Sequence, residues 1–144
     1  MEVYFSPNGG AENAVVAAIG QARGSIQVMM YTFTSGAIAG ALKEAHDRGV
    51  KVAVILDRSE AGQRYCSANY LRAAGIPVFI DTVHGLAHNK VMILSNEVVI
   101  MGSYNYTSAA SLHNAENLLI VHDGGLAKVY RENWERRLSQ AERF

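Results

Sequence analysis

Residues 88–116 read HNKVMILSNEVVIMGSYNYTSAASLHNAE, and this stretch decides how the second half of the chain is expected to fold. Two apolar runs, residues 91–94 and 98–101, lie on either side of the polar residues 95–97. Short apolar runs separated by a polar break are typical of a β-hairpin. Pairing the strands outward from the break gives the facing pairs Leu94–Val98, Met92–Ile100, Lys90–Gly102 and His88–Tyr104.

The open end of this hairpin gathers polar side chains that suit an anion. His88 and Lys90 are two residues apart, so on a strand both point to the same face. Ser103 and Asn105 have the same spacing just after the second strand. An ammonium, a hydroxyl and an amide can hydrogen-bond an oxyanion, and an imidazole can act as a nucleophile. The residues therefore predict a small anion site that contains a nucleophile.

Upstream of the hairpin, helical and strand patterns alternate. Three glycines each follow an apolar stripe at helical spacing and precede an apolar strand candidate: Gly24, Gly49 and Gly75. Glycine readily adopts the left-handed conformation that ends many helices. A final helix begins at Gly124–Gly125, and the expected strands outside the hairpin are 3–5, 26–33, 50–57, 76–81 and 117–121.

This order of elements predicts an α/β fold with a mixed, largely parallel β-sheet flanked by helices on both faces. The near-uniform apolar run at residues 52–56 suits a strand that is buried on both faces. A chain of 144 residues with 49% hydrophobic and 18% charged residues is large enough to form a globular core. We therefore expect a single domain over residues 1–144.

Charge and hydropathy narrow the partners and leave the compartment open. With 13 basic and 13 acidic residues the net charge is zero, so a nucleic acid would be held by a local basic patch. No apolar run approaches the roughly 20 residues of a membrane-spanning helix, so no membrane anchor is expected in this chain. The first residues do not resemble a signal peptide. The protein is expected to be cytoplasmic as the chain stands, and periplasmic or secreted if a signal peptide has been removed.

The pattern H-x-K followed by G-S-x-N resembles the signature of the phospholipase D superfamily in its single-copy nuclease form. Glu116 is placed like the family's downstream carboxylate, and the other matching residues are His88, Lys90, Gly102, Ser103 and Asn105. The resemblance covers nearly the whole chain and implies the phospholipase D/nuclease fold. The family motif also has an aspartate, mainly structural, five residues after the lysine. This chain has Ser95 there, which bears on the stability of the hairpin loop more than on the chemistry.

The resemblance implies a two-step reaction at phosphorus. His88 attacks as a neutral imidazole and forms a phosphohistidine, and a second, protonated imidazole donates its proton to the leaving oxygen. The chain contains one copy of the motif. For single-copy members the resemblance therefore implies a homodimer, with an active site at the two-fold interface that holds one His88 from each subunit.

The resemblance also assigns roles to the other motif residues. Lys90 neutralises the phosphoryl oxygens, and Asn105 and Ser103 donate hydrogen bonds to them or fix the cage around them. Glu116 is expected to hydrogen-bond the ring nitrogen of His88 that does not attack, which fixes the tautomer. No metal and no other cofactor is expected.

Three further residues are expected to bind substrate. Gly102 lets the backbone come close where a side chain would obstruct. Arg58 follows a strand whose carboxyl end should border the site, and with Arg64 it is a candidate contact for a nucleic-acid backbone. A solvated surface arginine is an equally good interpretation of both.

These observations favour a homodimeric, metal-independent endonuclease with little sequence preference, acting on DNA, with RNA as an open alternative. A lipid phosphodiesterase of the phospholipase D type would use the same chemistry, but lipid-cleaving family members usually carry two motif copies or a membrane anchor. A catalytically silent nucleic-acid-binding module is a third alternative. Ser95 mildly favours that alternative, whereas the joint presence of the five polar motif residues disfavours it.

The other histidines and the cysteine carry no motif. His46 falls on the polar face of the second expected helix and is interpreted as solvated. His84 precedes the hairpin in a loop and is interpreted as loop decoration, with substrate contact as the alternative. Cys66 is expected to be a packing residue, and Tyr130 and Trp134 are expected to lie in the core.

Overall fold

An open eight-stranded sheet forms the frame of the molecule. The computed structural model describes residues 1–144. The strands are β1 (Glu2–Phe5), β2 (Ser25–Met30), β3 (Lys51–Asp57), β4 (Val78–Asp81), β5 (Lys90–Leu94), β6 (Val98–Gly102), β7 (Asn117–His122) and β8 (Glu142–Arg143). They lie in the order β1-β7-β6-β5-β2-β3-β4-β8. The helices are α1 (Ala11–Gln21), α2 (Gly36–Asp47), α3 (Arg58–Ala61), α4 (Ala68–Ala73), α5 (Ser108–Leu112) and α6 (Gly124–Ser139).

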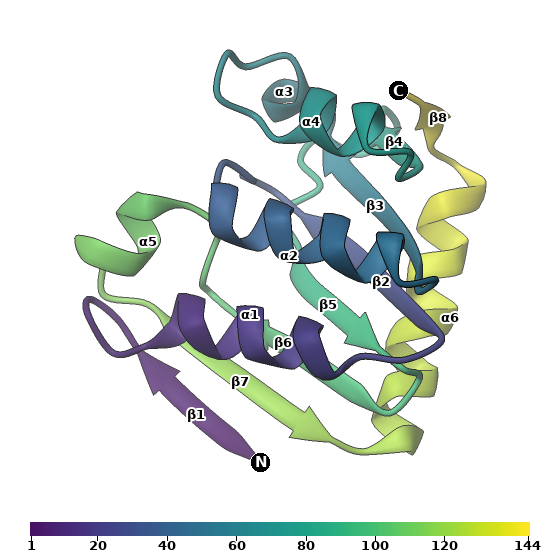
Figure 1. Ribbon diagram of the computed structural model, residues 1–144. Coiled ribbons are helices and arrows are strands. Elements are labelled where there is room, and N and C mark those ends of the chain that lie inside the picture. Colours follow the sequence, from purple (N-terminus) through teal and green to yellow (C-terminus); the bar gives the residue numbers. More distant parts are fainter.

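Helices cover both faces of the sheet. Figure 1 shows α1 and α2 across one face and α6 against the other. Successive side chains of a strand point to opposite faces, and β2 follows this rule: Val28 and Met30 join the core under α1 and α2, whereas Met29 packs with Trp134 of α6. None of the helices is both long and apolar enough to cross a lipid bilayer. The expectation of one α/β domain with a mixed sheet between two helical layers is confirmed.

The expectation that this mixed sheet is largely parallel is wrong. Only the pairs β2–β3 and β3–β4, in one half of the sheet, are parallel. The other five neighbouring pairs are antiparallel. Helical crossovers connect the parallel strands, as parallel neighbours require. From β5 onward the chain folds back on itself, and the edge strands β1 and β8 also run against their neighbours, so the alternating pattern of the first half describes only β2, β3 and β4.

Gly49 and Gly75 directly follow the C-caps of α2 and α4, as predicted, whereas Gly24 lies two residues beyond Ala22, the C-cap of α1. Gly24, Gly49 and Gly75 have φ angles of 76°, 100° and 88°, and a strand begins within three residues of each. The first of these strands, β2, ends at Met30, earlier than predicted. Beyond it Phe33 forms only a single bridge with Tyr106. Residues 31 and 32 therefore lie outside the strand ladder, just beyond the end of β2 where it pairs with Lys90.

The hairpin of β5 and β6 has the predicted register near its turn, where Leu94 pairs with Val98 and Met92 pairs with Ile100. The turn itself is tight. Ser95 and Asn96 have φ angles of 58° and 57°, and the N–H that follows them donates to the Leu94 carbonyl at 3.0 Å. Two central residues with positive φ are the mark of a type I′ turn, which matches the twist of a hairpin.

The open end of the hairpin differs from the prediction. The ladder between β5 and β6 stops at Val91 and Met101, so the pairs Lys90–Gly102 and His88–Tyr104 do not form. Gly102 pairs instead with Leu118 of β7 and has a φ of 144°, which redirects the chain. As a result Tyr104 is buried in the core beneath α1 and α2.

Candidate active site

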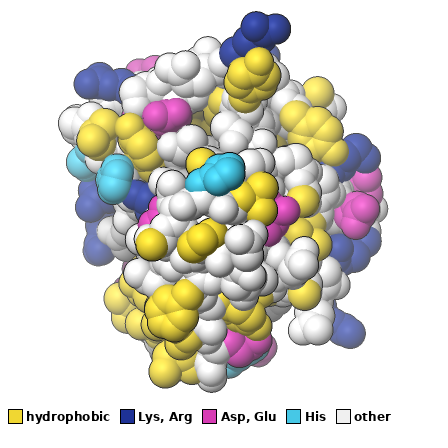
Figure 2. Space-filling model, turned by 90° about the vertical axis from the view of Figure 1, so that its left-hand side faces the viewer, with side chains coloured by type: hydrophobic (Ala, Val, Ile, Leu, Met, Phe, Trp, Pro, Cys, Tyr) yellow, Lys and Arg dark blue, Asp and Glu magenta, His cyan; other side chains and the backbone are white.

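The predicted motif residues converge at one edge of the sheet. The carboxyl ends of β2, β3, β4 and β6 meet the amino ends of β5 and β7 at this edge, because β5 and β7 run antiparallel to their neighbours. Figure 2 looks at the molecule from the side on which α5 lies, and histidine side chains are exposed there beside hydrophobic and basic ones. The site is therefore built from strand ends and loops, where a rigid sheet positions exposed groups.

His88 and Lys90 meet as their spacing predicts. The Lys90 Nζ lies 2.8 Å from Nδ1 and 3.1 Å from Nε2 of the His88 ring, and it donates to the His88 carbonyl at 2.9 Å. Burial lowers the pKa of Lys90 below its ordinary value, and the nearby Glu116 carboxylate opposes this shift. The ammonium is thus partly desolvated, which strengthens its attraction for an anion.

Tyr31 completes this arrangement from the end of β2. Its ring centroid lies 4.7 Å from that of His88, and the Lys90 ammonium lies 5.5 Å from the same tyrosine ring. Sequence reasoning missed Tyr31, because nothing near it in the sequence indicates that a residue 57 positions upstream packs against the histidine. Its contact follows from the pairing of β2 with β5.

Ser103 and Glu116 form a second polar pair. The Ser103 hydroxyl donates to the Glu116 carboxylate at 2.7 Å and accepts from the Asn117 N–H at 3.1 Å. The other carboxylate oxygen accepts from the Asn114 amide at 3.3 Å. The predicted hydrogen bond between Glu116 and the His88 ring is absent, so that detail is wrong within one chain. The physical reason is that the serine and asparagine engage both carboxylate oxygens.

The backbone around Glu116 is fixed by a residue from the start of the chain. Ser6, at the end of β1, donates its N–H to the Glu116 carbonyl at 3.0 Å, and its hydroxyl accepts from the Glu116 N–H at 3.1 Å. The same hydroxyl donates to the Asn114 carbonyl at 2.9 Å. No local signal predicts this role, since the partners are 110 residues apart in sequence. Ser6 is a site residue that only the fold reveals.

Asn105 and Gly102 both contact neighbouring segments of the chain. The Asn105 side-chain oxygen accepts from the Thr32 N–H at 3.2 Å, which leaves the amide N–H groups as the donors available to a ligand. A Cβ at Gly102 would collide with the Asn117 carbonyl oxygen and would lie 2.7 Å from its side-chain oxygen. The close approach at Gly102 is thus to the neighbouring strand.

A cleft of about 560 Å³ runs beside these residues. His88, Lys90 and Ser103 form its polar rim, and its apolar wall consists of Val91, Met101, Leu119 and Tyr130. Tyr130 thus lines the cleft as well as packing on the sheet, where a core position was predicted. Four of the motif residues, His88, Lys90, Gly102 and Ser103, therefore border a space large enough for a phosphodiester, whereas Asn105 and Glu116 do not line it.

Arg58 and Arg64 do not line the cleft. Arg58, the first residue of α3, donates from Nη1 to the Thr82 carbonyl at 3.2 Å. The Arg64 guanidinium lies 5.5 Å from the ring centroid of Tyr65. Both are exposed near the carboxyl end of β3, so they border the site edge without reaching the cleft.

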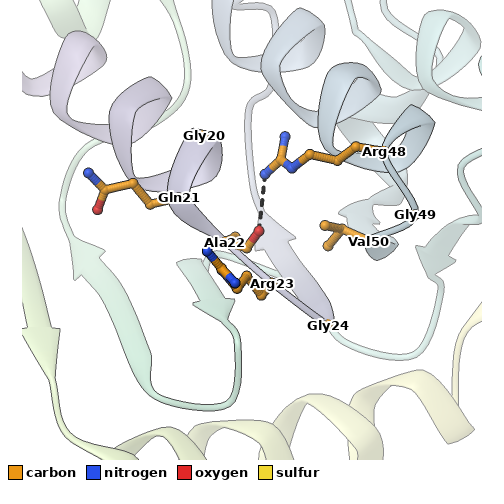
Figure 3. Close-up of a pocket in the computed structure, with 8 residues that line it drawn as sticks. All are labelled: Gly20, Gln21, Ala22, Arg23, Gly24, Arg48, Gly49 and Val50. Atoms are coloured by element: carbon orange, nitrogen blue, oxygen red, sulfur yellow. Dashed lines mark hydrogen bonds between the residues drawn. The ribbon is translucent and has the colours of Figure 1, made fainter.

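A second depression lies at the opposite end of the strands and is unrelated to the motif. It has a volume of about 600 Å³ and is lined by residues 20–24 and 48–50. Figure 3 shows Arg48 pointing to the backbone at the end of α1, where its guanidinium donates to the carbonyls of Ile19 and Ala22. The arginine caps a helix end there. No three histidine, cysteine or acidic side chains come together as a metal-binding group anywhere in the chain.

Comparisons with known proteins agree with this geometry. Residues 15–138 match the family described as "Cardiolipin synthase, PLD-like domain". The chain is 42% identical over 133 residues to "Phospholipase D" of Rickettsia conorii, covering 92% of this chain and 66% of that protein. It is 36% identical over 115 residues to "Mitochondrial cardiolipin hydrolase" of Mus musculus, covering 80% of this chain and 52% of that protein. The chain thus spans a little under two thirds of the length of the first relative and about half of the second.

Solved structures point the same way. The phospholipase D family member Nuc from Salmonella typhimurium superimposes with a TM-score of 0.95 at 36% identity, covering 99% of this chain and 96% of Nuc. NucT from Helicobacter pylori has the same fold, with a TM-score of 0.90 at 24% identity over 99% of this chain and 98% of NucT. Motif, fold and relatives agree: the chain belongs to the phospholipase D superfamily and carries one copy of the H-x-K and G-S-x-N motifs.

Proposed function

We propose that the protein is a metal-independent phosphodiesterase that cleaves nucleic acid, as an endonuclease of low sequence preference with DNA as its main substrate and RNA as a second one. The observation that carries the proposal is the convergence of His88, Lys90 and Ser103 on one cleft, with Glu116 hydrogen-bonded to Ser103. Each group suits one part of phosphodiester chemistry. The imidazole is a nucleophile, the ammonium and the Asn105 amide bind oxyanions, and the Ser103–Glu116 pair orders the rim.

The reaction proceeds in two displacements. A ring nitrogen of His88 forms a bond to phosphorus while the bond to the leaving oxygen breaks, and an imidazolium gives that oxygen its proton. The neutral imidazole left behind then takes a proton from water, the water oxygen bonds to phosphorus, and the N–P bond breaks. Lys90 and Asn105 hold the phosphoryl oxygens through both steps.

One chain supplies one of the two imidazoles, so the proposal includes a homodimer that shares its site. Exposed apolar side chains lie near the cleft on β1 and on α6. Val3 and Phe5 of β1 are 47% and 67% exposed, and Val129 of α6 is 61% exposed. Val3 pairs with Leu119, which also lines the cleft, so this surface continues into the cleft wall. A second copy packed on it would bring His88 of the partner subunit toward the same phosphate.

A lipid phosphodiesterase is the second candidate, because the names of the relatives favour it. The Rickettsia relative is named a phospholipase D and the mouse relative a cardiolipin hydrolase. The nuclease proposal is supported by the match to Nuc, which extends over 96% of Nuc, whereas the lipid-named relatives have a third to a half of their length outside the match. A catalytically silent nucleic-acid-binding module remains the third candidate.

Two substrates in one buffer separate the three candidates. The wild-type protein is incubated in EDTA with supercoiled plasmid DNA and, separately, with phospholipid vesicles that contain cardiolipin. We expect DNA nicking without phospholipid cleavage, and His88→Ala is expected to lose at least about 10⁴-fold in rate. Cleavage of lipid alone would establish the second candidate, and DNA binding without cleavage would establish the third. Near-normal nicking by His88→Ala would exclude the histidine mechanism.

A further inference from the structure

The loop that leads into His88 is held by buried side chains instead of backbone pairing. Outside helices and strands the chain makes 32 backbone–backbone hydrogen bonds, and none of them involves residues 82–89. This loop connects β4 to β5 and ends at His88, so side-chain contacts must fix the position of the imidazole.

Two aspartates at neighbouring strand ends hold this loop. Asp57 and Asp81 are register partners on β3 and β4, and they are 1% and 4% exposed. Asp57 accepts the Ala87 N–H at 2.6 Å, one residue before His88. Asp81 accepts the N–H groups of Val83 and His84 at 3.0 and 3.1 Å. Both ends of the loop are therefore anchored to the ends of buried strands.

Hydrogen bonds stabilise the charged form of Asp57. Burial would raise the pKa of Asp57, but hydrogen bonds from the Ala87 N–H and from the backbone and hydroxyl of Ser59 lower it below its ordinary value. One carboxylate oxygen accepts from Ala87, and the other accepts both bonds from Ser59. An asparagine at position 57 would turn an NH₂ group toward one of these N–H donors, and two facing donors cannot hydrogen-bond.

The middle of the loop is tied to α6 through His84. Its Nδ1 lies 2.7 Å from the Asp81 carboxylate, and its Nε2 lies 3.0 Å from Nη1 of Arg137. A guanidinium only donates, so Nε2 accepts and Nδ1–H donates to Asp81. His84 therefore bridges a buried carboxylate and the last turn of α6, which is a more specific role than the loop decoration that the sequence suggested.

We propose that Asp57 and the bridge Asp81–His84–Arg137 form a clamp that positions His88 for attack on phosphorus. None of the clamp residues lines the cleft, so they are positioning residues. Small displacements of a reacting group cost large factors in rate, and a loop without backbone pairing is free to make them once a clamp contact is lost. The expected effect of the clamp on the reaction rate rests on the proposed function. Its expected effect on the position of the His88 ring does not.

Kinetics on a small generic substrate tests the clamp, because bis(p-nitrophenyl) phosphate is independent of the choice between nucleic acid and lipid. We expect Asp57→Asn to lower kcat by about 10²-fold and His84→Ala by about 10-fold, with KM changed less than about threefold. Ser59→Ala is the matched control. It removes only the hydroxyl contact to Asp57 and keeps the Ala87 bond, so its kcat is expected to stay within about threefold of wild type.

A readout of the ring itself separates failure of the clamp from failure of the proposed function. The ¹H–¹⁵N NMR signals of the His88 ring are expected to shift or broaden in Asp57→Asn and His84→Ala, while those of His122 at the far end of β7 stay in place. The His84 side chain is 34% exposed, so His84→Ala keeps the test open if Asp57→Asn does not fold.

Unchanged His88 signals in a folded clamp variant overturn the inference whether or not the wild type is active, and so does an unchanged kcat in both variants. If the wild type cleaves no substrate but the His88 signals shift in the clamp variants, the proposed function is overturned and the clamp is not.

Discussion

At the scale of single residues, the site depends on the electrostatic balance around Lys90. Its ammonium is partly desolvated, which lowers its pKa, and the Glu116 carboxylate opposes the shift. Removing the charge of Glu116 removes the opposing influence, so the pKa of Lys90 falls further. We therefore expect the Lys90 ammonium to titrate at lower pH in Glu116→Gln than in the wild type, followed through its ¹³Cε NMR signal.

The control for that prediction is Glu97→Gln, which makes the same change of charge in the turn at the other end of β5 and β6. The titration of Lys90 in this variant is expected to match that of the wild type. The glutamine at position 116 can still accept from the Ser103 hydroxyl, so the comparison isolates the charge. A Lys90 titration that stays in place in Glu116→Gln would show that the Glu116 charge does not act on this ammonium.

Gly102 offers a test of stability at a single position. Its φ of 144° and the nearby Asn117 carbonyl leave no room for a Cβ. We expect Gly102→Ala to lower the free energy of unfolding by about 1–3 kcal/mol, measured by urea denaturation. Gly40→Ala in α2, where nothing lies within 4 Å of an added Cβ, is expected to be neutral or to stabilise by up to about 1 kcal/mol. Equal stability of the two variants would contradict this account.

Sequence reasoning reaches some of these residues and not others, for a physical reason. His88, Lys90, Ser103 and Asn105 are recognisable because strand periodicity and a short connection bring them together. Ser6 and Tyr31 act through pairings between distant strands, β1 with β7 and β2 with β5. Nothing in their local sequence encodes those pairings.

At the scale of elements, the turn of the β5–β6 hairpin shows what Ser95 does at the family's aspartate position. Its hydroxyl accepts the Arg23 N–H at 2.8 Å, and its own N–H donates to the Ser25 carbonyl at 2.8 Å. The serine therefore ties the hairpin to the segment between α1 and β2. The sequence left open whether Ser95 weakens the hairpin, and these contacts support a stabilising role.

Removing the hydroxyl tests that role. Ser95→Ala loses the bond from Arg23 and keeps the positive φ, so we expect it to lower the free energy of unfolding by about 1–2 kcal/mol. Ser95→Asp keeps an acceptor for the same N–H and is expected to be at least as stable as wild type. Urea denaturation followed by the fluorescence of the single tryptophan measures both. The hairpin role fails if Ser95→Ala unfolds at the wild-type midpoint.

The elements themselves were predictable where local chemistry determines them. Gly49 and Gly75 end helices with a positive φ that glycine adopts readily, so these helix ends can be recognised in the sequence. Strand direction was not predictable in the same way. The antiparallel positions of β1 and β8 are set by which sheet edge remains open after the other strands have paired, and no residue within those short strands specifies it.

At the scale of the whole molecule, the exposed apolar residues allow a test of whether two subunits share one active site or each chain is active alone. These residues are Val3, Phe5 and Val129. Val129 is 61% exposed and lies beside Tyr130, which lines the cleft. A glutamate at position 129 remains solvated in the monomer but would be buried without a partner in the proposed interface, which is costly. We therefore expect Val129→Glu to sediment as a monomer and to lose at least about 10²-fold in nicking rate, because each site then lacks its second imidazole.

Tyr70→Glu is the matched control. Tyr70 is 47% exposed on α4, which packs against the opposite face of the sheet. This variant is expected to stay dimeric and active. A monomeric Val129→Glu that nicks DNA at the wild-type rate would show that one His88 suffices.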